Sequence, residues 1–139
     1  ALLDRMVTIH LDYFDEETER EIVVAKTGIS VQEAKKIVGI LRDFRQANGV
    51  SRPVTIRPAI LIGKVMKQQN IPVSINPIFI DICVDALASG RNHNEEAKKA
   101  VEMVIDLVQK HCPSPSQMVR NSWGRFVSKF SDQSKGGEI

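Results

Sequence analysis

The stretch S-V-Q-E-A-K-K-I-V-G-I-L-R-D-F, residues 30–44, decides the predicted fold. It opens with a capping box, in which Ser30 and Glu33 each satisfy a backbone N–H group of the other. Asn48-Gly49 marks the end of the segment. The apolar residues between these signals recur at the spacing of one face of an α-helix: Val31, Ala34, Ile37, Val38, Leu41 and Phe44.

Similar start and stop signals predict further helices on both sides of this one. Each begins at a residue whose side chain accepts a hydrogen bond from the first turn, or with a proline near its start, and several end at glycine. Between them, the apolar residues again fall on one face. These helices run from Asp15 to about Lys26, from Thr55 to about Gln69, from Asn76-Pro77 to Ser89-Gly90, and from Glu95 to His111. In the helix that begins at Asn76-Pro77, the residues predicted to point inward are Ile78, Phe79, Ile82, Cys83, Ala86 and Leu87.

A last helix is predicted after the breaker Pro113–Ser116, with Ser116 as its cap. It would carry an aromatic-rich stripe, which favours packing in the core or on a neighbouring helix over a partner site. The polar, glycine-containing end, residues 131–139, is expected to be frayed. The stripe consists of Val119, Trp123, Phe126, Val127 and Phe130.

Before the helices, Met6–Leu11 alternate between apolar and polar residues, which predicts one short strand. A lone strand needs partners, so residues 1–12 are expected either to be poorly ordered or to pair with another chain. Because the chain begins with Ala1 instead of Met, we expect it to be processed, truncated or a fragment.

Composition excludes several classes of function. The 139 residues fit one domain, or one domain plus a short appendage. The 19 basic and 17 acidic residues leave a net charge of +2, which gives no footprint for nucleic acid or an anionic membrane. No window approaches the roughly 18 to 20 apolar residues of a membrane span. Cys83 and Cys112 have no metal-ligand spacing and are expected to be reduced thiols in a cytosolic protein.

Candidates for catalysis are few. His10, His93 and His111 lie in different elements and are expected to be surface or capping residues. The acidic run 15–17 stands at a helix start, which favours interaction with the helix dipole over metal binding. The pair His111-Cys112 precedes a proline at a helix end, where a nucleophile and its base rarely meet. No G-x-x-x-x-G-K-[ST] loop occurs, so the chain cannot cradle and hydrolyse a nucleotide by itself.

The N-terminal sequence A-L-L-D-R-M-V-T-I-H-L resembles the join in AAA+ ATPases between the last core helix and the final core strand, with Met6 where the pattern usually has Phe. The order T-G-I-S, then R-P-V-T-I-R-P-A-I-L-I-G-K-V, is similar to the helical lid of the MoxR-like branch. The stretch I-P-V-S-I-N-P-I-F-I-D-I-C-V-D-A-L resembles the gas-vesicle protein N (GvpN) family. The resemblance covers about residues 1–89.

This resemblance implies an all-α helical bundle that forms a lid domain, with one short N-terminal strand left over from an α/β core. The domains would be 1–13, the end of the core; 14–90, the lid; and 91–139, a helical extension. Arg5 matches an arginine finger that reaches the nucleotide of a neighbouring subunit, and Arg57 matches the lid arginine called sensor 2. The nearby Arg52 leaves open which arginine reaches the phosphate.

For the intact parent, the resemblance implies an ATPase that uses ATP and Mg²⁺, forms a homo-oligomeric ring and acts on a substrate protein such as a gas-vesicle component. The chain alone would bind no cofactor and no metal. It would be cytoplasmic, where it could associate with gas vesicles. The alternative from a different class is a stand-alone helical protein-interaction module without enzymatic activity, using the Val119–Phe130 face. A helical nucleic-acid-binding domain is the weaker third alternative, because the chain lacks a basic stripe.

Overall fold

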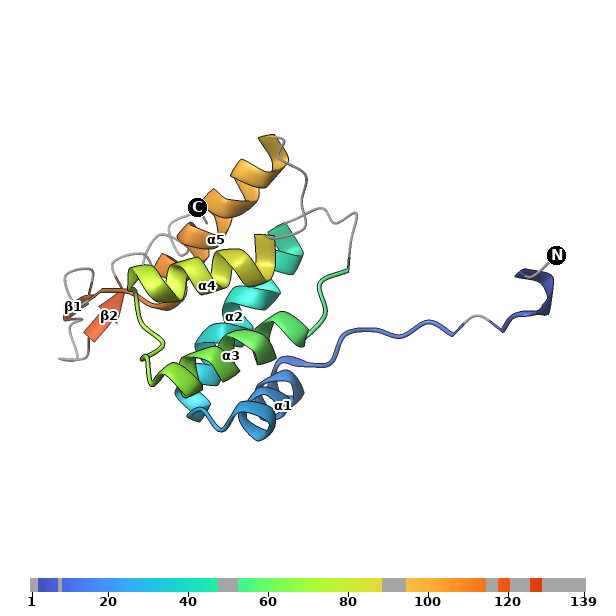
Figure 1. The fold of residues 1–139 in the computed structure, drawn as a ribbon, viewed down its shortest axis with the longest axis horizontal. Coiled ribbons are helices and arrows are strands. Elements are labelled where there is room, and N and C mark those ends of the chain that lie inside the picture. Colours follow the sequence, from blue (N-terminus) through green and yellow to red (C-terminus); the bar gives the residue numbers. More distant parts are fainter. Residues whose placement is uncertain are drawn as a thin grey trace, which may run out of the picture.

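The fold is a bundle of α-helices, seen in a computed structural model (Figure 1). The structure describes residues 4–7, 9–47, 53–88 and 95–114 in full, and the backbone alone of residues 3, 118–120 and 126–128. The helices in these parts are α1 Glu16–Thr27, α2 Val31–Ala47, α3 Arg57–Gln69, α4 Pro77–Ala88 and α5 Glu95–His111, preceded by a 3₁₀ helix, Leu3–Arg5.

Helix α2 packs against α1, α3 and α5, and α4 packs against α3 and α5. All five helices contribute to one continuous core, whose largest fully buried side chains include Phe44 of α2 and Phe79 of α4. None of the helices in the described part is both long and apolar enough to cross a bilayer. The predicted fold class, an all-α helical bundle, is confirmed for the main body of the described part.

The predicted helix caps are formed at three starts. Asp15 accepts hydrogen bonds from the Thr18 backbone N–H at 2.8 Å and the Thr18 hydroxyl at 2.9 Å. The capping box of α2 is complete, because Ser30 Oγ accepts from the Glu33 N–H at 3.2 Å and Glu33 Oε2 accepts from the Ser30 N–H at 3.0 Å. Asn76 Oδ1 accepts from the Phe79 N–H at 2.8 Å at the start of α4. These helices therefore begin where local hydrogen bonding dictates.

The start of α3 differs from the prediction by one residue. Thr55 was expected to cap it, but the cap position is Ile56, which makes no side-chain capping bond. Thr55 Oγ1 instead accepts a long hydrogen bond, 3.4 Å, from the Arg57 N–H. Pro58 explains the missing cap, because it stands three residues after Thr55 and has no N–H from which the Thr55 hydroxyl could accept a hydrogen bond.

Two predicted core positions are wrong. Val31 is 57% exposed and Ile78 is 54% exposed, whereas Ile40, which was not predicted to be inside, is 1% exposed. Val31 is the first residue of α2. In α4 almost every residue is apolar, so the spacing of apolar residues cannot show which face is buried.

The strand predicted over Met6–Leu11 is not formed. Among its described residues no strand is present, and Thr8 lies outside them. The segment runs away from the bundle (Figure 1), and Val7 and Leu11 are each 88% exposed. A strand is stable only when its backbone pairs with another, and the described part of the chain offers this one no partner.

The helix predicted after Ser116 is also wrong. The backbone forms two antiparallel strands, β1 Met118–Arg120 and β2 Phe126–Ser128, with Val119 paired to Val127. The β-branched and aromatic residues Val119, Phe126 and Val127 favour strands. Trp123, Phe130 and residues 131–139 lie outside the described residues.

Helix α5 has the predicted bounds and lies on α2 and α4. His111 at its end forms a 2.9 Å contact with Asp43 of α2, and Lys110 donates to the same carboxylate at 2.8 Å. The ring of His111 lies directly over Gly39, so close that a β-carbon built there would be 2.6 Å from the ring. A glycine in the middle of α2 thus makes room for the end of α5.

Candidate functional site

Arg57, the predicted nucleotide-binding residue, is the first residue of α3. Its side chain is exposed and makes no hydrogen bond or ion pair within the described residues. The first-turn N–H groups of a helix lack intrahelical acceptors, and the helix dipole adds partial positive charge there. An exposed guanidinium beside them is suited to an anion such as a phosphate.

Arg5, the predicted catalytic residue, ends the 3₁₀ helix Leu3–Arg5 and is exposed. This helix lies at the far end of the extended segment, well away from α3 (Figure 1). The structure therefore does not bring Arg5 and Arg57 together within one chain. Arg52, the alternative phosphate contact, lies outside the described residues.

A buried ionic network lies between α1 and α2. The Glu19 side chain is 1% exposed and pairs with two arginines: its Oε1 lies 2.7 Å from Arg45 Nη1 and its Oε2 lies 3.0 Å from Arg42 Nη1. The Arg45 side chain is only 8% exposed. Two guanidinium groups thus share one carboxylate that is removed from water.

The same two arginines also contact the segment that precedes α1 and the segment that precedes α3. Arg42 Nη1 donates to the Phe14 carbonyl at 3.1 Å, and the Arg45 guanidinium lies 4.1 Å above the centre of the Tyr13 ring. Arg45 Nε donates to the Val54 carbonyl at 2.6 Å. The network therefore joins the segment that precedes α1 to the segment that precedes α3.

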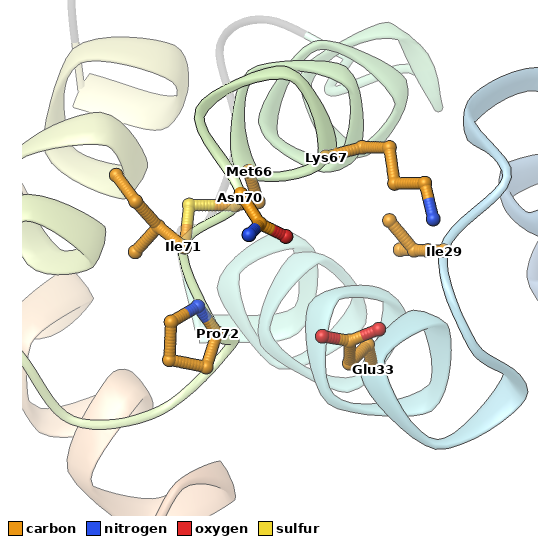
Figure 2. Close-up of a pocket in the computed structure, with 7 residues that line it drawn as sticks. All are labelled: Ile29, Glu33, Met66, Lys67, Asn70, Ile71 and Pro72. Carbon is orange, nitrogen blue, oxygen red and sulfur yellow. The ribbon is translucent and has the colours of Figure 1, made fainter.

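A hollow of about 230 Å³ lies at the opposite end of α3 from Arg57 (Figure 2). Figure 2 shows Lys67 and Asn70, at the end of α3, across from Glu33 of α2. The Glu33 carboxylate already serves the capping box, and the hydrogen bonds from Ser30 lower its pKa. We therefore assign no ligand to this hollow.

The remaining candidates from the sequence lack the geometry for catalysis. Burial raises the pKa of the Cys83 thiol to about 12, and it also raises the pKa of Cys112. The ring of His111 contacts Asp43 instead of the neighbouring Cys112, so the thiol is not activated by a base. Burial alone would raise the pKa of Asp43, but the hydrogen bonds and the charge attraction from Lys110 and His111 together lower it. His93 lies outside the described residues. Within the part of the chain that the structure describes, no three metal-ligating side chains gather.

Sequence reasoning missed the network of Glu19, Arg42 and Arg45. Glu19 belongs to the run E-E-T-E-R-E, which is typical of a solvated first turn. The one available signal was the spacing of Arg42 and Arg45, which puts two cations on the same side of α2, close to the buried Leu41 and Phe44.

No protein-family model matches the chain. Among curated proteins, it is 30% identical over 120 residues to the gas vesicle ATPase GvpN of Ancylobacter aquaticus, covering 82% of this chain and 34% of that protein. It is 38% identical over 90 residues to GvpN of Haloferax mediterranei, covering 64% and 25%. It is 29% identical over 66 residues to the putative chaperone BssE of Thauera aromatica, covering 48% and 23%.

The helical bundle and these similarities associate the chain with a class of ATPases and chaperones. More particularly, the chain is homologous to part of the gas vesicle ATPases named GvpN, three of which align with more than three quarters of it. The resemblance to the GvpN family that the sequence predicted is confirmed. The chain spans about a third of the length of the first of these relatives.

Proposed function

We propose that this chain is the lid region of an ATP-hydrolysing AAA+ protein, and that Arg57 contacts the phosphates of the bound ATP as sensor 2. The observation that carries the proposal is the position of Arg57, exposed and without a partner in the described residues, in the first turn of α3. Its planar, permanently charged group suits a phosphate better than a lysine would.

Arg5 is proposed as an arginine finger that acts on the nucleotide of a neighbouring subunit. Two features support this: Arg5 is exposed, and it stands outside the bundle at the end of an extended segment. A residue that projects from its own subunit is placed to reach another one. A finger stabilises negative charge on the transferring phosphoryl group and typically speeds hydrolysis by about 10³ to 10⁵-fold.

For the whole protein we propose ATP as substrate with Mg²⁺, a homo-oligomeric ring, and action on a protein of the gas vesicle. The names of the GvpN relatives support the link to gas vesicles, and the name of BssE supports a chaperone-like role. Residues 1–13 would be the end of the ATPase core, 14–90 the lid and 91–139 an extension. The protein would be cytoplasmic and associated with gas vesicles.

The test measures ATP hydrolysis by the full-length protein with Arg57→Ala, Arg5→Ala and, as a matched control, Lys64→Ala. Lys64 is an exposed cation of the same helix as Arg57, two turns further on. Both arginine variants are expected to lose most of the activity, and the control should retain it. Wild-type rates for both arginine variants would refute the proposal.

Mixing subunits separates the two roles. Arg5→Ala subunits supply an intact Arg57, and Arg57→Ala subunits supply an intact finger. If the two arginines serve one shared site from different subunits, mixed rings recover part of the activity that each variant lacks alone. No recovery in any mixture would contradict the assignment of Arg5 to the neighbouring subunit.

A further inference from the structure

We propose that Arg45 is a positioning residue, which fixes the start of α3 and hence Arg57 relative to the segment that leads into the bundle. The inference rests on the proposed role of Arg57. Nothing in the sequence pattern assigned a role to Arg45, and its side chain is too buried, at 8% exposure, to meet a nucleotide itself.

The geometry gives Arg45 three different attachments. Nη1 is held by Glu19 at 2.7 Å, Nε donates to the Val54 carbonyl at 2.6 Å, and the guanidinium plane lies 4.1 Å from the centre of the Tyr13 ring. Only a planar group with several donors can make all three contacts at once. The segment before α1 and the segment before α3 thus share one anchor on α2.

This anchor holds the backbone just before α3, where side-chain capping is weak. The cap position Ile56 makes no side-chain capping bond, and the Thr55 hydroxyl contacts the Arg57 N–H only at 3.4 Å. Among the described residues, the shortest side-chain hydrogen bond near Arg57 is therefore the one from Arg45 to the Val54 carbonyl, three residues earlier. A displacement of about 1 Å in a positioning element can lower a rate by about 100-fold.

Stability alone is a poor explanation for the network. Removing charges from water costs free energy, and replacing a buried ion pair by apolar residues is often neutral or stabilising. In addition, Arg45 Nη2 is buried and has no hydrogen-bond partner among the described residues. A buried donor without an acceptor is costly, so a cluster selected only for stability would not be expected to retain it.

The first experiment is a double-mutant cycle on ATP hydrolysis by the full-length protein, using Arg45→Lys and Arg57→Ala. Lysine keeps the charge beside Glu19 but cannot also lie flat on Tyr13 and reach Val54. We expect Arg45→Lys to lower kcat about tenfold when Arg57 is present and less than about twofold when Arg57 is replaced. The second factor is smaller because Arg45 acts through Arg57, so its loss matters little once Arg57 is gone. Equal factors in the two backgrounds would overturn the proposal.

Arg42→Lys is the matched control, since Arg42 also pairs with Glu19 but does not contact Val54. Any loss it causes should have the same factor with and without Arg57. If Arg45→Lys fails to fold, Tyr13→Leu takes its place, because it removes the ring beneath the guanidinium and leaves the ion pair intact. The same dependence on Arg57 is expected.

The second experiment keeps the two proposals apart. In the 139-residue chain, the backbone NMR resonances of Thr55, Ile56 and Arg57 should shift in Arg45→Lys by more than in Arg42→Lys. If Arg57→Ala hydrolyses ATP at the wild-type rate, the role of Arg57 fails, and these resonances alone decide whether Arg45 positions the segment. Equal or absent shifts in the two variants would refute the positioning role.

Discussion

Replacing Gly39 by alanine tests how α5 is held on α2. In an exposed or half-buried helix interior, alanine stabilises by about 1 kcal/mol relative to glycine. Here the new β-carbon would lie 2.6 Å from Cε1 and Nδ1 of His111, which is closer than real atoms approach. Either the ring moves or α5 moves, and the sign of the effect depends on what that movement costs.

The cost can be bounded from the contacts of His111. Overpacking in a close contact costs about 1 to 3 kcal/mol, and a displaced ring also loses its 2.9 Å contact with Asp43. These losses exceed the gain in helix propensity. We therefore expect Gly39→Ala to destabilise the chain by about 1 kcal/mol, against the usual direction for this substitution.

Removing the ring should reverse the sign. In a His111→Ala background nothing opposes the alanine, so Gly39→Ala should stabilise by about 1 kcal/mol, which makes the coupling between the two sites about 2 kcal/mol. Urea unfolding followed by far-ultraviolet circular dichroism gives both values, from midpoints at constant m. If alanine stabilises equally in both backgrounds, the close approach of His111 to Gly39 is refuted.

Two further predictions concern buried groups. Glu19→Ala should lower the free energy of unfolding by about 3 to 5 kcal/mol, because it leaves Arg42 and Arg45 without their shared anion. The control Glu17→Ala breaks an exposed pair with Arg20 and should change this free energy by less than about 1 kcal/mol. Similar urea midpoints for the two variants would contradict the network. Because burial raises the pKa of Cys83 to about 12, iodoacetamide near pH 8 should label it slowly in the folded chain and rapidly in urea; mass spectrometry showing rapid labelling of the folded chain would exclude this burial.

Helix starts were predictable because their determinants are local. Asp15, Ser30 and Asn76 each bond to a backbone N–H three residues ahead, so the signal and the structure lie in the same few letters of sequence. The start of α3 was less predictable, since Thr55 and Pro58 give competing signals and the proline decides.

Long-range pairing was not predictable in the same way. Glu19 and Arg42 are 23 residues apart, and nothing in a single sequence shows that two such charges meet in the interior. The predicted site residues illustrate the same limit. The structure places Arg57 at a helix start, but its role and that of Arg5 depend on subunits and a nucleotide outside this chain, so both stay predictions.

The helix predicted for the C-terminal region was wrong for a further reason. Val119, Phe126 and Val127 fit a helical stripe by spacing, but their intrinsic preference is for strands, and the strand pairing of Val119 with Val127 prevailed. The interaction-module alternative assumed a helical face there, so it loses that basis. The boundary at residue 90 stays a prediction, because residues 89–94 lie outside the described residues, although α5 shares the core of the preceding helices.

The side-chain caps also bear on the order in which the chain folds. Contacts between residues three positions apart close almost no loop, so α1, α2 and α4 can begin to form before the chain collapses. The bonds from Lys110 and His111 to Asp43 span 67 and 68 residues and require most of the bundle to be in place. We therefore expect the docking of α5 to be the last and slowest step of folding.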